Sequence, residues 1–214
     1  HRNRDVGGES STKYMVQGMM ASAVSLYGMS FIFGLTGSTY FDAISAQIGS
    51  LAGTPLFWFG MVLLLAGFLF KLAVVPFHFW APDTYEASPH EVTTFIASVS
   101  KVAAIALLCR IVSLIIPAGV DAAGLQQILM WFSIAAMTLG NLAALRQGDL
   151  KRLLGYSAVA HAGYALIGVQ TLSAMGLTAA LFYGVGYAAM SLTCFLVVAA
   201  VGHDQDKVSI ESMS

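Results

Sequence analysis

Two lysines occur in apolar stretches of the sequence where charged residues are rare. Lys71 follows a charge-free run that covers residues 43–70, and Lys101 lies within the apolar segment 92–117. An ionisable side chain inside a bilayer is costly, so it usually faces the interior of a helix bundle and marks a path for ions or protons. Both lysines are therefore candidates for proton transfer.

A helix break is predicted immediately after the first of these lysines. Pro76 follows Lys71 by five positions, and His78 comes two positions later. Because proline lacks an N–H group and clashes with the carbonyl four residues earlier, the helix should end just beyond Lys71. Broken helices at membrane depth occur in protein or beside water-filled cavities, and transporters use them at ion sites. The alternative is that Lys71 extends its amine to the cytoplasmic surface.

Lys101 is predicted to lie deep in its own helix. If Val92 begins that helix, a rise of about 1.5 Å per residue places the lysine ~13 Å along it. Thr94, Ser98 and Lys101 share one face, so we expect a polar stripe that leads to the amine. The alternative is a structural lysine paired with a carboxylate, but no Asp or Glu occurs at that depth in the sequence. Arg110, nearer the helix end, is interpreted as structural because a guanidinium does not readily release its proton.

A histidine lies at similar depth in another apolar segment. His161 is expected near the middle of a helix, on one face with Ser157 and Tyr164. A neutral imidazole can pass a proton between its two ring nitrogens, so His161 is a candidate relay. A hydrogen-bonded packing histidine is the alternative. A weaker polar face further on is interpreted as ordinary packing: Tyr183, Tyr187, Ser191 and Cys194.

The composition predicts an all-α polytopic membrane protein. The 214 residues are 57% hydrophobic and only 10% charged, whereas soluble domains carry about 25% charged residues. The alternating segments of a membrane β-barrel do not occur. We expect a single transmembrane domain over residues 1–214, a bundle of about six spans with one helix broken near Pro76. The expected spans are Tyr14–Leu35, Phe57–Trp80, Val92–Ile116, Leu125–Leu145, Leu150–Leu172 and Leu177–Val201.

Basic residues fall on one side of this predicted topology. The other side receives no Lys or Arg in its loops, so the positive-inside rule places both ends of the segment in the cytoplasm. The expected location is a bacterial inner membrane or an organellar energy-converting membrane. The basic residues are Arg2, Arg4, Lys13, Arg146, Lys151, Arg152 and Lys207.

Several other functions receive no support from the sequence. No basic stripe indicates nucleic acid binding, and the two cysteines, Cys109 and Cys194, form no metal or disulfide motif, so both are expected to be buried apolar residues. We expect no metal site and no catalytic residues in the chain. It begins in a polar segment without Met, which suggests part of a longer protein.

Three segments together resemble a known family. Phe70–Asp83, with its Pro-Phe-His-Phe-Trp sequence, is similar to the broken-helix motif of the antiporter-like membrane subunits of respiratory complex I (NADH-quinone oxidoreductase). Thr12-Lys13-Tyr14 and Leu150–Tyr164 resemble subunit N of that complex, whose mitochondrial counterpart is NADH dehydrogenase subunit 2; residues 141–147 continue the match. The polar segment Ala87–Glu91 departs from the usual Ala-Pro turn of the family.

The resemblance implies a proton-translocating subunit and roles for individual residues. Lys71 matches the lysine before the helix break, His78 the histidine of the break, and Lys101 the lysine of the next helix. His161 matches the histidine after the Lys-Arg motif. The family's intramembrane glutamate is expected upstream of this segment, since Glu9 is assigned to a connecting loop. The family's later broken helix, which carries its own lysine, is expected downstream of Ser214. The resemblance therefore implies that the segment is the central part of an antiporter-like subunit.

The resemblance also implies partners and cofactors. NADH, FMN, iron–sulfur clusters and quinone are expected in other subunits and none in this chain. The expected partners are the lipid bilayer and other membrane subunits, including neighbouring antiporter-like ones. Two alternatives stay open: a sodium/proton antiporter subunit, or a membrane subunit of a related hydrogenase or quinone reductase in which this chain is only a scaffold.

Overall fold

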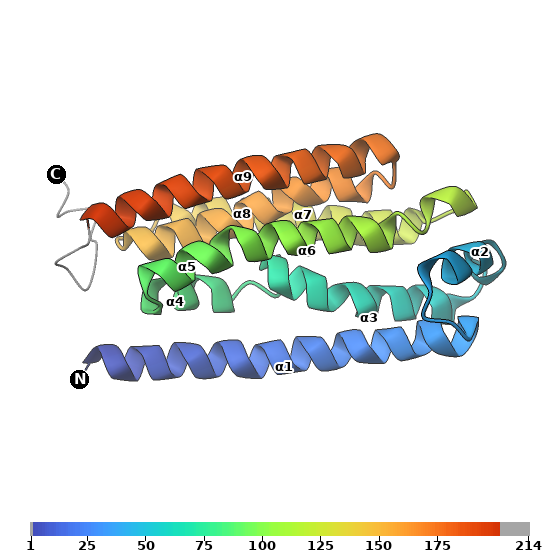
Figure 1. Ribbon diagram of the computed structural model, residues 1–214, viewed down its shortest axis with the longest axis horizontal. Coiled ribbons are helices and arrows are strands. Elements are labelled where there is room, and N and C mark those ends of the chain that lie inside the picture. Colours follow the sequence, from blue (N-terminus) through green and yellow to red (C-terminus); the bar gives the residue numbers. More distant parts are fainter. Residues whose placement is uncertain (1, 202–214) are drawn as a thin grey trace.

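The long helices lie along one common axis (Figure 1). The computed structural model describes residues 2–201, and the predicted basic residue Lys207 lies outside them. No strand occurs in the described range, so the all-α prediction is confirmed. The helices are α1 (Arg2–Thr36), α2 (Phe41–Leu51), α3 (Pro55–Leu72), α4 (Trp80–Ala87), α5 (His90–Ala97), α6 (Val99–Val112), η1 (Ile116–Ala118), α7 (Ala123–Ala144), α8 (Leu150–Gln170) and α9 (Ala174–Val201).

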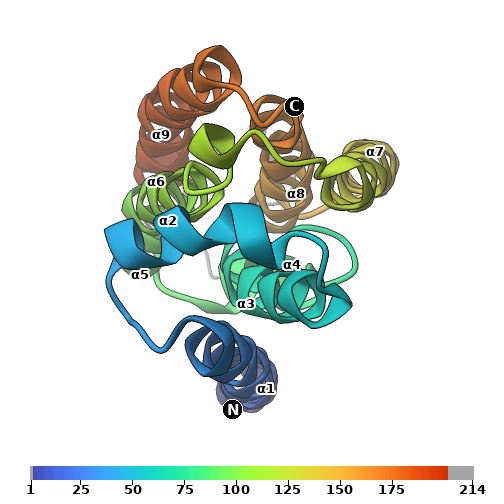
Figure 2. The same cartoon turned by 90° about the vertical axis from the view of Figure 1, so that its right-hand side faces the viewer.

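The start of α1, the α4–α5 connection, the α7–α8 connection and the end of α9 lie at the same end of the bundle, here called the terminal end (Figure 1). Helix α2 lies at the opposite end and donates a hydrogen bond there from Ser45 Oγ to the carbonyl of Leu114, 3.1 Å away. Viewed along the axis, α1 lies outermost on one side and α7, α8 and α9 lie on the other, with α3 and α6 between them (Figure 2).

Five helical segments in the described part of the chain are long and apolar enough to cross a membrane. They are Gly7–Thr36, Pro55–Leu72, His90–Ala118, Ala123–Ala144 and Ala174–Ala200. Helix α8, with 21 residues, is not among these five, and it carries Lys151, Arg152 and His161. The predicted span Leu150–Leu172 therefore stays a prediction.

Three local features differ from the sequence-based expectation. Glu9 was assigned to a loop, which is wrong, because α1 is continuous from Arg2 and includes it. The predicted helix 92–116 is interrupted at Ser98, where φ is −106° and ψ is −80°, so it forms α5 and α6. Helix α2 was not predicted, since its 11 residues are too short to cross a bilayer.

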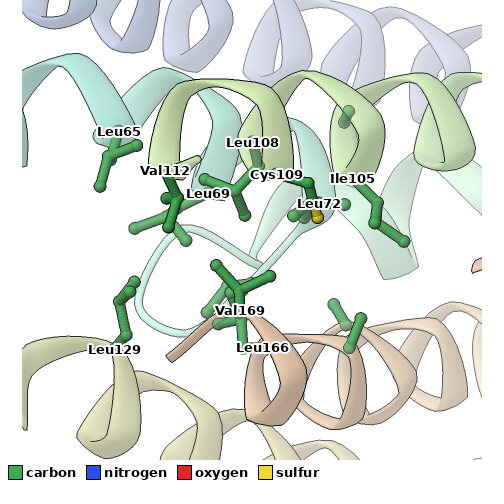
Figure 3. Packing of buried hydrophobic residues seen from close by; sticks show 14 of the residues in the cluster. Leu65, Leu69, Leu72, Ile105, Leu108, Cys109, Val112, Leu129, Leu166 and Val169 are labelled. Atoms are coloured by element: carbon green, nitrogen blue, oxygen red, sulfur yellow. The ribbon is translucent and has the colours of Figure 1, made fainter. Parts of the chain in front are cut away.

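The core lies between α3, α6, α7 and α8 (Figure 3). Leucines 65, 69 and 72 of α3 face Leu108 and Val112 of α6, with Leu129 of α7 and Leu166 of α8 on the other side. Small residues let the helices approach each other closely. A Cβ atom added to Gly28 of α1 would overlap the backbone of Leu64, and one added to Gly140 of α7 would lie 2.7 Å from the backbone nitrogen of Ala160.

The outer faces of the bundle are apolar, as expected for helices that contact lipid or other membrane proteins. Large apolar side chains are exposed on the outermost helices. They include Met15, Met19, Met20 and Leu26 on α1, Trp131 and Leu142 on α7, and Phe182 and Leu196 on α9.

Candidate functional site

The predicted helix break lies directly after Lys71. Helix α3 ends at Leu72, and Ala73 adopts a left-handed conformation with φ 60° and ψ 38°. The chain is then non-helical until α4 begins at Trp80. Because proline clashes with the carbonyl four residues earlier, Pro76 explains why the last helical residue is Leu72. The prediction of a helix broken near Pro76 is thus confirmed.

Trp80, the first residue of α4, links the two sides of the break through a hydrogen bond to α3. Its indole Nε1 donates a 2.9 Å hydrogen bond to the carbonyl of Phe70 in the last turn of α3, which also accepts from the backbone N–H of Ala73. The indole is buried, with 1% of its surface exposed. His78 lies within the break, where its ring packs on Phe79 with a centroid distance of 4.3 Å. Its Nδ1 atom is buried and has no hydrogen-bond partner among the described residues.

Lys71 is half-buried and points toward α1. Its Nζ donates a 3.0 Å hydrogen bond to the hydroxyl of Tyr14 and lies 5.7 Å from the centre of that ring. The Tyr14 ring in turn packs against Phe70 and Trp80. The amine also lies in the last turn of α3, where the helix dipole favours a positive charge. The site of Lys71 is therefore built from α1 and from both sides of the break.

Lys101 is buried, with 2% of its surface exposed. Its Nζ donates a 2.7 Å hydrogen bond to the carbonyl of Ala158 on α8, and it lies 5.5 Å from the centre of the Tyr187 ring on α9. An ammonium group has three hydrogens to donate, so this carbonyl satisfies one of them. The described partners of Lys101 come from α8 and α9, and those of Lys71 come from α1.

Thr94 and Ser98, predicted to form a polar stripe that leads to Lys101, donate hydrogen bonds from their hydroxyls to backbone carbonyls of the preceding helical turn. Both hydroxyls bond within the helix: Thr94 Oγ1 donates to the carbonyl of His90 and Ser98 Oγ to that of Thr94, each at 2.6 Å. Such bonds to the preceding turn often bend helices. The interruption at Ser98 lies three residues before Lys101.

His161 lies in a cluster of tyrosines. Its Nδ1 is hydrogen-bonded to the hydroxyl of Tyr183 at 2.6 Å. The imidazole also contacts the rings of Tyr164 and Tyr187, with centroid distances of 5.5 and 5.0 Å. Ser157, one turn before His161, is half-buried. Asn141 of α7 donates a 2.9 Å hydrogen bond to the hydroxyl of Tyr164.

Sequence reasoning assigned Tyr183 and Tyr187 to ordinary packing and gave Asn141 no role at the site. The two tyrosines lie four residues apart on α9, and this spacing correctly predicted that they share one face of the helix. Their spacing could not indicate that this face meets His161 and Lys101. Cys109 is buried as expected, and Cys194 is half-buried. Among the described residues, no three His, Cys, Asp or Glu side chains lie close enough together to hold a metal ion.

Charged residues form a network at the terminal end of the bundle. Arg152 of α8 pairs with Asp83 at 2.8 Å and with Glu86 at 3.0 Å, both on α4. Lys13 of α1 pairs with Asp83 at 3.2 Å. The neighbouring Lys151 donates a 2.6 Å hydrogen bond to the carbonyl of Ser88. The side chains of Lys13, Asp83, Glu86 and Arg152 line a cavity of about 230 Å³, and their ion pairs tie α4 to both α1 and α8.

A protein-family model described as NADH:quinone oxidoreductase/Mrp antiporter, TM, matches residues 2–214. NADH-quinone oxidoreductase subunit N 2 of Syntrophobacter fumaroxidans is 42% identical to the chain over 213 residues, which are 100% of this chain and 44% of that protein. Subunit N 2 of Opitutus terrae is 45% identical over 206 residues, or 96% of this chain and 42% of that protein. The chain thus spans less than half the length of these relatives.

Solved structures of membrane complexes share the fold. A chain of respiratory complex I from Thermus thermophilus aligns with a TM-score of 0.77 and 35% identity, covering 95% of this chain and 42% of that one. A chain of the Mrp complex from Dietzia sp. DQ12-45-1b aligns with a TM-score of 0.85 and 25% identity, covering 95% of this chain and 37% of its own length. A chain of the archaeal membrane-bound sulfane sulfur reductase also reaches a TM-score of 0.85 at 25% identity, with coverages of 95% and 42%.

Proposed function

Because the chain belongs to the NADH:quinone oxidoreductase/Mrp antiporter transmembrane family, we propose that it is a proton-translocating part of subunit N of NADH-quinone oxidoreductase. Quinone reduction elsewhere in the complex would drive protons along Lys71, Lys101 and His161. The names of the curated relatives support this assignment, since each is a subunit N at about 40–45% identity.

The observation that carries the proposal is the environment of Lys101. The amine is buried in the middle of a helical bundle and is held by one carbonyl and one aromatic face. The carbonyl belongs to Ala158, less than one helical turn from His161. A buried ionisable group with so few compensating contacts is sensitive to charge nearby, so movement of a neighbouring charge can change its protonation.

Lys71 and His78 supply a second group of titratable side chains, at the helix break. Lys71 Nζ donates a hydrogen bond to the Tyr14 hydroxyl, and the His78 Nδ1 is buried without a hydrogen-bond partner among the described residues. Irregular backbone at membrane depth is tolerated where it lines a cavity or lies within protein. We assign the break, with Pro76, to the part of the path that exchanges protons with Lys71.

The chain is an integral membrane protein by family and by its apolar helices. We place it in a bacterial inner membrane or an organellar membrane, with the terminal end of the bundle in the cytoplasm. The one-sided charge supports this orientation, because Lys13, Lys151 and Arg152 all contribute to the network at the terminal end. NADH, FMN, iron–sulfur clusters and quinone would be bound by partner subunits.

A sodium/proton antiporter subunit is the second candidate. The TM-score favours it, at 0.85 for the Mrp chain against 0.77 for the complex I chain. Sequence identity favours complex I, at 35% for the Thermus thermophilus chain and 25% for the Mrp chain. Translocation that requires sodium in vesicles would favour the antiporter.

The test is NADH-driven proton translocation by the assembled complex, reconstituted in vesicles with the full-length subunit. We expect Lys101→Ala to abolish most of the translocation while quinone reduction shows that the complex still assembles. Arg110→Ala is the matched control, because Arg110 is exposed and contacts the Phe41 ring at the opposite end of the bundle. Unchanged translocation in Lys101→Ala would contradict the proposal.

A further inference from the structure

The hydroxyl of Tyr183 is hydrogen-bonded to the imidazole of His161. The proton path proposed above gives Tyr183 no role. The 2.6 Å distance from its hydroxyl to Nδ1 is short for a hydrogen bond that involves nitrogen. The two rings are stacked, with an interplanar angle of 27° and centroids 6.0 Å apart. This geometry keeps the hydroxyl against the ring nitrogen, and α9 rather than α8 supplies the hydroxyl.

The surroundings of His161 leave Tyr183 as its direct proton partner. On its own helix, Tyr164 meets the imidazole edge to face and takes its hydrogen bond from Asn141 of α7. On α9, Tyr187 offers its ring to both the imidazole and the amine of Lys101 from α6. Of these neighbours, Tyr183 has a hydroxyl within hydrogen-bond distance of an imidazole nitrogen. Tyr183 itself is half-buried.

We propose that Tyr183 is a proton-relay residue through which protons leave His161 toward α9; this inference rests on the proposed function. When a proton binds Nε2 of His161, the proton on Nδ1 passes to the Tyr183 hydroxyl oxygen. In the same step the hydroxyl's own proton passes to a water molecule beside it, so the phenol is never doubly protonated. The imidazole ends with one proton, on Nε2, and the phenol ends neutral, so rotation of both groups restores the starting state.

The relay requires that the imidazole and the hydroxyl can each donate and accept a proton, and both groups can do so. A neutral imidazole donates from one nitrogen and accepts at the other, and a phenol both donates and accepts. A structural role for Tyr183 would need only the stacked ring. The two roles therefore differ in whether the acidity of the hydroxyl matters.

The experiment measures NADH-driven proton translocation as a function of pH in the reconstituted complex with the full-length subunit. Tyr183→Phe keeps the ring and removes the hydroxyl, and we expect a loss of about a hundredfold, as for a positioned proton-transfer group. Replacing Tyr183 with fluorotyrosines of increasing acidity should restore translocation and shift its pH profile in step with that acidity. Tyr27→Phe is the matched control, since Tyr27 is 60% exposed on α1.

Two outcomes would overturn the relay. One is wild-type translocation in Tyr183→Phe; the other is a loss in Tyr183→Phe with a pH profile that no fluorotyrosine moves, which indicates a structural role. Lys101→Ala, measured in parallel, separates the two proposals. Loss of translocation in Lys101→Ala with either of these outcomes refutes the relay alone, whereas unchanged translocation in Lys101→Ala refutes the proposed function and the relay that rests on it.

Discussion

Arg152 on α8 forms a 2.8 Å ion pair with Asp83 on α4, although the two residues are 69 positions apart. The pair joins the helix that follows the break to the helix whose Ala158 carbonyl binds Lys101. The same α8 carries His161. One helix therefore holds the break, the buried lysine and the histidine in a fixed relation to one another.

The Arg152–Asp83 pair should stabilise the fold measurably. Their side chains are 33% and 25% exposed, so solvent screens the pair only in part. In a double-mutant cycle with Arg152→Gln and Asp83→Asn, we expect a coupling free energy of about 1 kcal/mol. Thermal unfolding of the detergent-solubilised complex provides the measurement.

The Lys13–Glu9 pair is the control for this cycle. Its side chains are 44% and 67% exposed, so its coupling should be smaller than that of Arg152 and Asp83. Equal coupling free energies in the two cycles would show that the Arg152–Asp83 pair between α4 and α8 stabilises the fold no more than an exposed pair does.

Gly155 should be intolerant of even a methyl group. A Cβ atom there would lie 2.8 Å from the Cα of Pro82, so α4 would have to move away from α8. We expect Gly155→Ala to lower the free energy of unfolding by about 1–3 kcal/mol. Gly186→Ala on α9 is the control, because nothing lies within 4 Å of its added Cβ. Similar stability of the two variants would contradict this close approach of helices.

Ala73 should accept glycine without loss of stability. A left-handed conformation costs a residue with a Cβ roughly 1–2 kcal/mol, and glycine avoids this cost. We therefore expect Ala73→Gly to range from neutral to about 1 kcal/mol more stable. Ala66→Gly, within α3, should instead lose about 1 kcal/mol. If thermal unfolding gives equal losses for both, the left-handed end of α3 is not a source of strain.

Tyr14 should support the function of Lys71 through its hydroxyl. Tyr14→Phe keeps the ring packed on Phe70 and Trp80 and removes the acceptor of the 3.0 Å hydrogen bond from Lys71 Nζ. A hydrogen bond to a charged group contributes about 1.5–3 kcal/mol, so we expect proton translocation to fall roughly tenfold or more. Tyr40→Phe, 78% exposed, is the control. An unaffected Tyr14→Phe variant would show that Lys71 does not depend on this partner.

Local sequence patterns were sufficient for the features that a single helix determines. The apolar runs predicted the long helices, and Pro76 predicted the break because its steric effect acts within one helical turn. The burial of Lys101 followed from its distance along an apolar segment. Its partner did not, since a backbone carbonyl on another helix leaves no mark on side-chain patterns.

The features that were missed depend on contacts between helices or on competing local bonds. The interruption at Ser98 involves hydroxyl bonds that the sequence permits but does not require. Tyr183 becomes a partner of His161 only when α9 packs against α8. Glu9 was placed in a connecting loop before Thr12-Lys13-Tyr14, yet α1 is continuous through it and pairs Glu9 with Lys13 one turn away.

Lys101→Arg is the substitution that tests most directly whether the Lys101 amine carries a proton. Arginine keeps the positive charge but does not release its proton under physiological conditions. In the reconstituted complex with the full-length subunit, we expect Lys101→Arg to retain assembly and lose NADH-driven proton translocation. Translocation at the wild-type rate would contradict a proton-carrying role and leave Lys101 with a purely structural charge.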